Sequence, residues 1–137
     1  MCAQDYDPHY LSYFECFNQQ RFFEAHEVLE VLWLTQRDGP NGPFYKGLIQ
    51  LAGAFVHWQK NRPGPAAALF ESTQVNLRKY PGTHEGLNVT SVLTAINEWL
   101  RQLMAAAPGA CPPVPTRTPE VRLGTPAHAR VRRNGTD

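Results

Sequence analysis

Apolar residues recur at helical spacing in five separate stretches of this 137-residue chain. Asp7 and Pro8, an N-cap residue and a first-turn proline, predict a helix that begins here and runs to about residue 18. No segment alternates with the two-residue period of a strand. Pro- and Gly-rich stretches separate the remaining helices, which are predicted at about residues 21–37, 44–61, 66–80 and 89–106. The predicted fold class is therefore all-α, an antiparallel bundle of about five helices.

The composition and the apolar periodicity of the chain change after residue 106. Six of its 12 prolines lie beyond Met104, and no apolar periodicity remains from Pro108 onward. Such a segment buries too little apolar surface to offset the entropy lost on ordering. We therefore predict a helical bundle domain of residues 1–106 and a disordered, Pro- and Arg-rich C-terminal tail of residues 107–137.

Charge argues against a nucleic-acid-binding function. Residues 1–106 carry eight Lys and Arg against ten Asp and Glu, a net charge of −2. The tail carries five Arg against two acidic residues, a net charge of +3. The predicted folded part thus lacks the dense basic patch that nucleic acid requires.

Cysteine use and hydropathy suggest a cytoplasmic protein. The three cysteines are widely spaced, which favours a reducing compartment over a disulfide framework. The polar, acidic N-terminus does not predict a signal peptide, and the most apolar stretch, residues 48–58, is about half a membrane span. We expect no membrane partner, whereas homo-oligomer formation stays open.

Two of the predicted helices carry a polar sector on an otherwise apolar surface. On the helix at 21–37, His26 and Glu30 lie one turn apart between two groups of apolar side chains. On the helix at 44–61, which is apolar nearly all round, Lys46, Gln50 and His57 share one sector. Because buried polar groups need partners, we predict that the two sectors face each other.

The first sector contains the motif H-E-x-x-E, formed by His26, Glu27 and Glu30. In the related H-E-x-x-H motif, two His residues bind zinc and the Glu activates water. A carboxylate in the last position also binds zinc, and binds manganese more readily. One interpretation is thus a divalent metal, zinc or manganese, held by His26, Glu30 and His57, with Glu27 as the catalytic base. Three further residues are predicted beside the site, where they orient its groups or contact a ligand: Gln50, Lys46 and Trp33.

Two other interpretations treat the protein as a non-catalytic helical module. In one, the His, Glu and Gln side chains of the two sectors form a closed hydrogen-bonded network that specifies helix packing. In the other, the same groups line a pocket for a small-molecule ligand, in which Lys46 neutralises a carboxylate or a phosphate. Elsewhere, His84 and Glu85 are predicted to lie exposed in a loop.

Two segments of the chain resemble the domain-of-unknown-function 309 family. These are E-A-H-E-x-x-E-x-x-W at residues 24–33 and G-L-I-Q-L-A at residues 47–52. The resemblance covers roughly residues 8–100 and leaves the tail unexplained. It implies a small all-helical fold. Because members of the family are described as predicted metal-dependent hydrolases, it also implies a hydrolytic activity that uses a metal ion.

Overall fold

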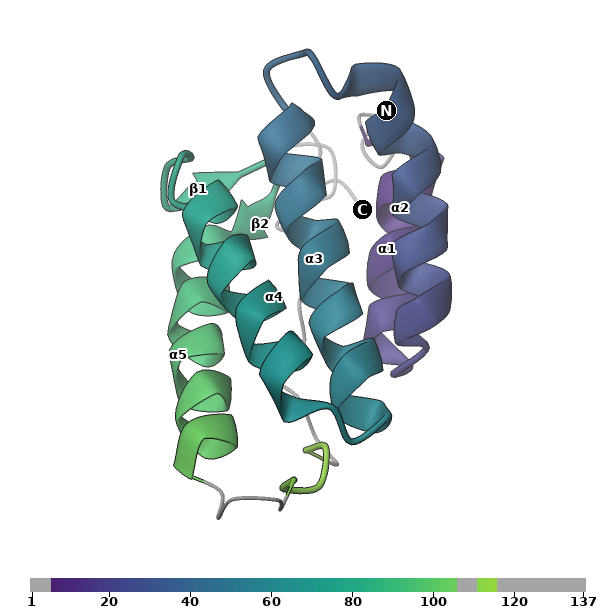
Figure 1. The fold of residues 1–137 in the computed structure, drawn as a ribbon. Coiled ribbons are helices and arrows are strands. Elements are labelled where there is room, and N and C mark those ends of the chain that lie inside the picture. The colour runs from purple at the N-terminus through teal and green to yellow at the C-terminus, as the bar shows by residue number, and fades with distance from the viewer. Residues whose placement is uncertain (1–5, 106–110, 116–137) are drawn as a thin grey trace, which may run out of the picture.

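The computed structural model describes residues 6–105 and 111–115 and confirms the all-α bundle. In Figure 1 the three central helices lie side by side, the first helix lies against the second, and the fifth lies beside the fourth. Each helix packs against the next one along the chain, in antiparallel order. The five helices are α1 (Pro8–Asn18), α2 (Phe22–Gln36), α3 (Gly42–Gln59), α4 (Pro63–Leu77) and α5 (Val89–Ala105).

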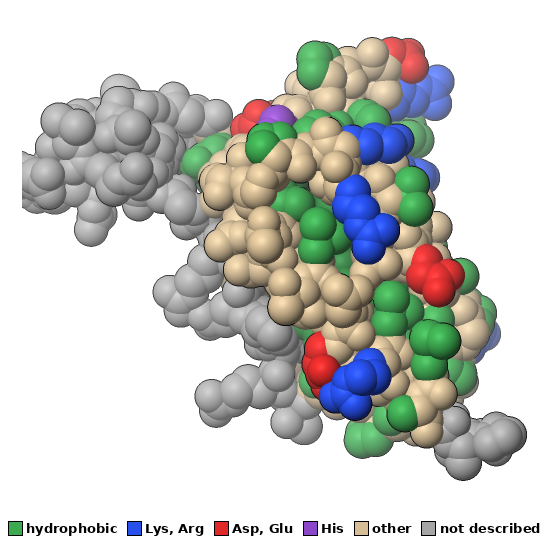
Figure 2. Space-filling view, turned by 90° about the vertical axis from the view of Figure 1, so that its left-hand side faces the viewer, with side chains coloured by type: hydrophobic (Ala, Val, Ile, Leu, Met, Phe, Trp, Pro, Cys, Tyr) green, Lys and Arg blue, Asp and Glu red, His purple; other side chains and the backbone are tan. Residues whose placement is uncertain are grey.

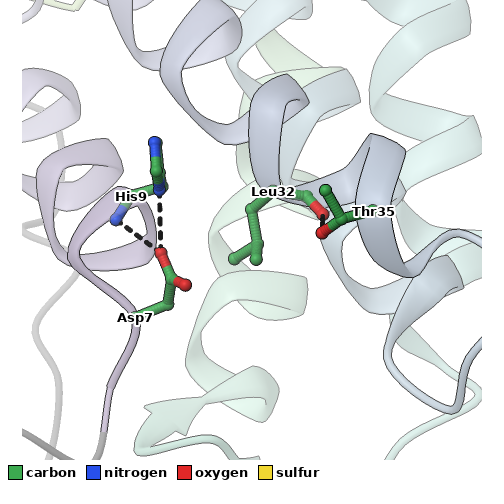
Figure 3. A network of polar contacts seen from close by, with 4 residues as sticks. All are labelled: Asp7, His9, Leu32 and Thr35. Carbon is green, nitrogen blue, oxygen red and sulfur yellow. Dashed lines mark hydrogen bonds and ion pairs between the residues drawn. The ribbon is translucent and has the colours of Figure 1, made fainter.

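Local capping explains where α1 and α5 begin. The Asp7 carboxylate accepts a hydrogen bond of 2.8 Å from the backbone N–H of His9 and contacts the His9 ring at 3.0 Å (Figure 3). The Asn88 side chain accepts one of 3.0 Å from the N–H of Ser91. Each contact satisfies a donor that the first turn of a helix leaves without a partner. At the end of α2 the Thr35 hydroxyl donates to the carbonyl of Leu32, also drawn in Figure 3.

Helix α4 begins at Pro63, three residues before the predicted start at residue 66. The first turn contains Pro63 and Pro65, which the sequence analysis assigned to the preceding break. Proline is compatible with a first helical turn because its missing N–H is not needed there and its φ angle is already helical. The prolines therefore open this helix.

The segment between α4 and α5 forms a short hairpin, where we expected an irregular loop. Strand β1 (Thr83–His84) pairs with strand β2 (Leu87–Asn88) in antiparallel register. Glu85 and Gly86 form the two-residue turn, and both have positive φ angles, of 50° and 74°. Positive φ at both central positions is typical of the turn that matches the twist of two paired strands.

The prediction that His84 and Glu85 are exposed was wrong. Both are half-buried. The Asn41 side chain contacts the His84 ring at 2.7 Å and donates to the Glu85 carboxylate at 2.9 Å. The Tyr10 hydroxyl donates to the Glu85 carbonyl at 2.8 Å. The hairpin is thereby fixed to the start of α3 and to α1.

The hydrophobic core is centred on Phe55 of α3. This side chain is fully buried and contacts an aromatic ring from each of the other four helices. The Phe22 ring stacks on it at 4.6 Å, while Phe17, Phe70 and Trp99 approach edge-on at 5.7, 5.3 and 4.8 Å between ring centroids. These geometries are the favoured ones for aromatic pairs.

Helices α3 and α4 pack closely at Gly47. A Cβ atom at this position would lie 3.1 Å from the Cβ of Asn76 and 3.2 Å from a methyl group of Leu77. Beside it, the buried Thr73 hydroxyl lies 2.9 Å from the carbonyl of Leu69 and 3.2 Å from that of Gly47. The absent side chain therefore sets the separation of the two helices.

The start of the predicted disordered tail is packed against the bundle. Residues 111–115 form neither a helix nor a strand, but Cys111 and Val114 contact the hydrophobic core. The rest of the predicted tail, residues 107–110 and 116–137, lies outside the described residues.

Within the described part of the chain, no helix is both long and apolar enough to cross a membrane. On the side where α5 lies, Lys and Arg side chains are spread apart among other groups (Figure 2).

We expect Gly47→Ala to lower the free energy of unfolding by about 1–3 kcal/mol, because the new methyl group overpacks the α3–α4 contact. The matched control is Gly64→Ala on α4, where a Cβ atom meets nothing within 4 Å. The control is expected to be neutral or slightly stabilising. Urea unfolding of both variants measures the difference, and an equal effect of the two substitutions would contradict the assigned contact.

Candidate functional site

A cavity of about 270 Å³ opens between α2, α3 and α4. Helix α3 contributes most of its wall, because residues 46, 49, 50, 53, 56 and 57 follow the three- and four-residue spacing of one helical face. Helix α2 contributes two residues one turn apart, and α4 contributes one. The lining residues are Phe23, His26, Lys46, Ile49, Gln50, Gly53, Val56, His57 and Leu69.

The cavity brings together four of the seven residues that the sequence singled out. Its lining includes His26, Lys46, Gln50 and His57, which come from the two polar sectors. It does not include the remaining three, which are Glu27, Glu30 and Trp33.

The two histidines each carry a buried nitrogen that has no hydrogen-bond partner among the described residues. These atoms are Nδ1 of His26 and Nδ1 of His57. The His26 ring lies parallel to the Phe23 ring, with an angle of 8° between them and 6.3 Å between centroids. A buried polar atom without a partner costs roughly 1–3 kcal/mol, so such atoms in a native cavity call for an explanation.

Within residues 6–105 and 111–115, the polar side chains do not form the predicted closed network. The Gln50 side-chain oxygen accepts a hydrogen bond of 2.8 Å from the Asn76 side chain of α4. No hydrogen bond within the described residues joins Gln50 to His57 or Glu30 to His26. Gln50 therefore ties α3 to α4, and Nδ1 of each histidine finds no hydrogen-bond partner in the described part of the chain.

Lys46 lines the cavity and also contacts the Trp33 ring. Its Nζ atom is 4.5 Å from the centroid of the Trp33 ring, within the range of a cation–π interaction. Trp33 is half-buried on α2, whereas Lys46 is half-buried on α3. The indole thereby restrains the ammonium group at the edge of the cavity, although Trp33 does not line it.

The carboxylates of the H-E-x-x-E motif lie outside the cavity lining. Glu30 is half-buried, and Glu27 is exposed. Among residues 6–105 and 111–115, no three His, Cys, Asp or Glu side chains come together as a group that could hold a metal ion. The cavity thus offers two imidazoles, whereas a catalytic zinc centre takes three protein ligands.

Sequence reasoning missed the apolar wall and the partner of Gln50. Ile49 and Val56 were detectable, because Ile49 lies three residues from Lys46 and Val56 lies seven residues, or two turns, beyond Ile49 on the same face. Leu69 and Asn76 lie on α4, whose pattern does not show that it borders the polar sectors of α2 and α3. Their position depends on how closely α4 approaches α3, which the pattern of one helix does not contain.

We expect His57→Leu to raise the free energy of unfolding by about 1 kcal/mol, because it removes a buried nitrogen that has no partner. The control Gln50→Leu is expected to lower it by about 1 kcal/mol, because it removes the acceptor of Asn76. Denaturant unfolding of the two variants measures the direction of each change in the free energy of unfolding. A destabilising His57→Leu and a neutral Gln50→Leu would show that the polar contacts are assigned wrongly.

Comparison with known proteins agrees with the resemblance noted from the residues. A relative from Aquifex aeolicus (strain VF5), named an uncharacterized protein, is 25% identical over 83 residues. This stretch is 61% of the present chain but 25% of the relative, so the chain spans only a small part of that protein's length. Residues 10–69, which include both quoted motifs, match the family described as "Domain of unknown function (DUF309)", and the predicted family resemblance is thereby confirmed over these residues.

Proposed function

We propose that this protein binds a small organic anion, a carboxylate or phosphate on a short apolar body, in the cavity between α2, α3 and α4. The observation that carries this proposal is the pair of buried imidazole nitrogens without partners, on His26 and His57, in the lining that also contains Lys46. A bound ligand group that accepts or donates a hydrogen bond would be a partner for these two nitrogens.

Charge favours an anion over a cation. Lys46 supplies a positive charge, and the described lining contains no Asp or Glu to neutralise it. A carboxylate or phosphate accepts hydrogen bonds from an ammonium group and from imidazole N–H groups alike. A cationic ligand would have no charged partner among these residues.

The rest of the wall favours a ligand with an apolar part. Phe23, Ile49, Val56 and Leu69 surround the polar groups with hydrocarbon. The volume of about 270 Å³ lies just below the usual range of small-molecule sites, roughly 300–1,000 Å³, which favours a short ligand. Gly53 adds room between Lys46 and His57 on the same face of α3.

The imidazoles can adapt to such a ligand without backbone movement. The χ2 angle of histidine has two broad preferred states about 180° apart. Rotation between them exchanges the positions of Nδ1 and Cδ2. Either ring can therefore turn a nitrogen from its buried position toward a bound group.

The second candidate is a metal-dependent hydrolase, favoured by the two imidazoles in one cavity. In that function, His26, Glu30 and His57 would hold a divalent ion and Glu27 would act as the base. Glu30 would have to turn toward the cavity to complete the three protein ligands of a catalytic zinc ion. The ion would lower the pKa of a bound water and polarise the bond under attack.

Three unbranched probes of six carbon atoms each test the anion proposal: hexanoate, hexanol and hexylammonium. We expect hexanoate to raise the thermal unfolding temperature most, hexanol less, and hexylammonium least, because ligand binding to the native state stabilises it. Isothermal titration calorimetry then gives the affinities. Equal shifts for hexanoate and hexylammonium would contradict an anion site.

A pair of lysine variants locates the binding. Lys46→Met keeps the apolar stem and is expected to weaken hexanoate binding by roughly tenfold, with little effect on hexanol, because it removes one charge-assisted hydrogen bond. Lys60→Met, at an exposed lysine just beyond α3, is the matched control and is expected to bind hexanoate like the wild type. If the two variants bind hexanoate equally, the site lies elsewhere.

Elemental analysis tests the metal candidate. A metal-dependent hydrolase requires about one equivalent of zinc or manganese in the purified wild type, and its loss from a folded His26→Ala, His57→Ala variant. The anion proposal predicts hexanoate binding to wild-type protein treated with a chelator. Loss of hexanoate binding on chelation, restored by zinc, would favour the metal candidate.

A further inference from the structure

The chain returns to the bundle after α5 through the sequence Cys-Pro-Pro-Val-Pro at residues 111–115. Three prolines fix φ near −65°, and every residue that precedes a proline is disfavoured in the helical region. No helix, strand or turn is formed here, and the described residues contain no cis peptide bond. This combination favours the polyproline II conformation, a left-handed helix with three residues per turn.

Two side-chain donors hold this segment at points one polyproline turn apart. The indole N–H of Trp58 donates to the carbonyl of Pro112 at 2.8 Å. The side-chain amide of Gln20 donates to the carbonyl of Pro115 at 3.2 Å. The side chains that contact the core, Cys111 and Val114, are also three residues apart. The contacts of this segment with the bundle thus recur every three residues, which is the period of a polyproline II helix.

Trp58 depends on this segment for its hydrogen bond. The side chain is 1% exposed, and its ring stacks on Phe55 at 5.8 Å. A buried indole N–H normally finds an acceptor, and here that acceptor is supplied from 54 residues further along the chain. In Figure 1 the yellow-green segment lies at the end of the bundle where α3 meets α4.

Gln20 adopts an uncommon backbone conformation at the end of α1. Its φ angle is 62°, a left-handed value that glycine or asparagine adopts more easily. Glutamine is less stable than glycine in this backbone conformation, but its side chain is long enough to reach Pro115. The hydrogen bond to the Pro115 carbonyl explains why glutamine occupies this position.

We propose that this end of the bundle, with Trp58 and Gln20 as donors, is a recognition surface for a proline-rich peptide in the polyproline II conformation. The chain's own residues 111–115, with prolines at 112 and 115 in the pattern Pro-x-x-Pro, are its occupant. Aromatic surfaces that offer hydrogen bonds to peptide carbonyls recognise such segments because the ligand is already ordered. The surface is separate from the anion cavity: His57 lines the cavity and the next residue, Trp58, holds the peptide.

The reaction of Cys111 with iodoacetamide reports docking in the full-length chain. A Cys2→Ser, Cys16→Ser background leaves Cys111 as the single thiol. The variant Pro112→Ala, Pro113→Ala, Pro115→Ala keeps every carbonyl acceptor but releases the φ restriction. We expect Cys111 in it to react roughly tenfold faster or more, because each proline lowers the entropy lost on docking.

A peptide added in trans tests recognition itself. A fluorescent peptide of residues 109–117, kept reduced, is expected to bind the triple-alanine variant and not the wild type, whose surface is filled. Adding Trp58→Phe to the triple-alanine variant should weaken peptide binding roughly three- to tenfold, since it removes one hydrogen bond and keeps an aromatic ring. A folded triple-alanine variant that leaves the peptide unbound would overturn the proposal.

The single variant Gln20→Gly keeps the test valid if the triple-alanine variant does not fold. Glycine relieves the left-handed backbone conformation and removes the amide donor. We expect faster Cys111 labelling, roughly threefold, together with an unchanged or higher unfolding temperature. Wild-type labelling rates in both Gln20→Gly and Trp58→Phe would show that the segment is not recognised by these donors.

Discussion

The contact of the Phe55 ring with one aromatic ring from each of the other four helices fixes the rotation of α3, and the rest of the structure follows from it. Successive residues of an α-helix are 100° apart, so residues two positions away point to nearly the opposite side. With Phe55 at the centre of the core, Gly53 and His57 must therefore turn away from it. They turn into the space between α2 and α4, where the cavity lies.

Periodicity and capping residues predicted most of the fold. Asp7 forms the predicted cap of α1, and the start of α5 at residue 89 agrees with the prediction, with the Asn88 side chain as its cap. The start of α4 was missed because Pro63 and Pro65 are equally compatible with a break and with a first helical turn. The hairpin was missed because a two-residue strand is too short to show an alternating pattern.

The composition of the cavity was only partly predictable. Wheel analysis of two helices placed His26 and His57 on sectors that both needed partners, and both residues line the cavity. Those wheels also placed Glu30 in the same sector, but it does not line the cavity. The hydrogen bond from Asn76 to Gln50 depends on the close packing of α4 at Gly47, which is a property of the folded chain.

The most direct test of the anion proposal is long-range ¹H–¹⁵N NMR of the histidine side chains during titration with hexanoate. The proposal predicts that the ring nitrogens of His26 and His57 shift and saturate with one common dissociation constant. His9 and His84 already contact Asp7 and Asn41, so their signals should stay in place. Binding of hexanoate with unchanged His26 and His57 signals, or a uniform shift of all histidines, would contradict the proposal.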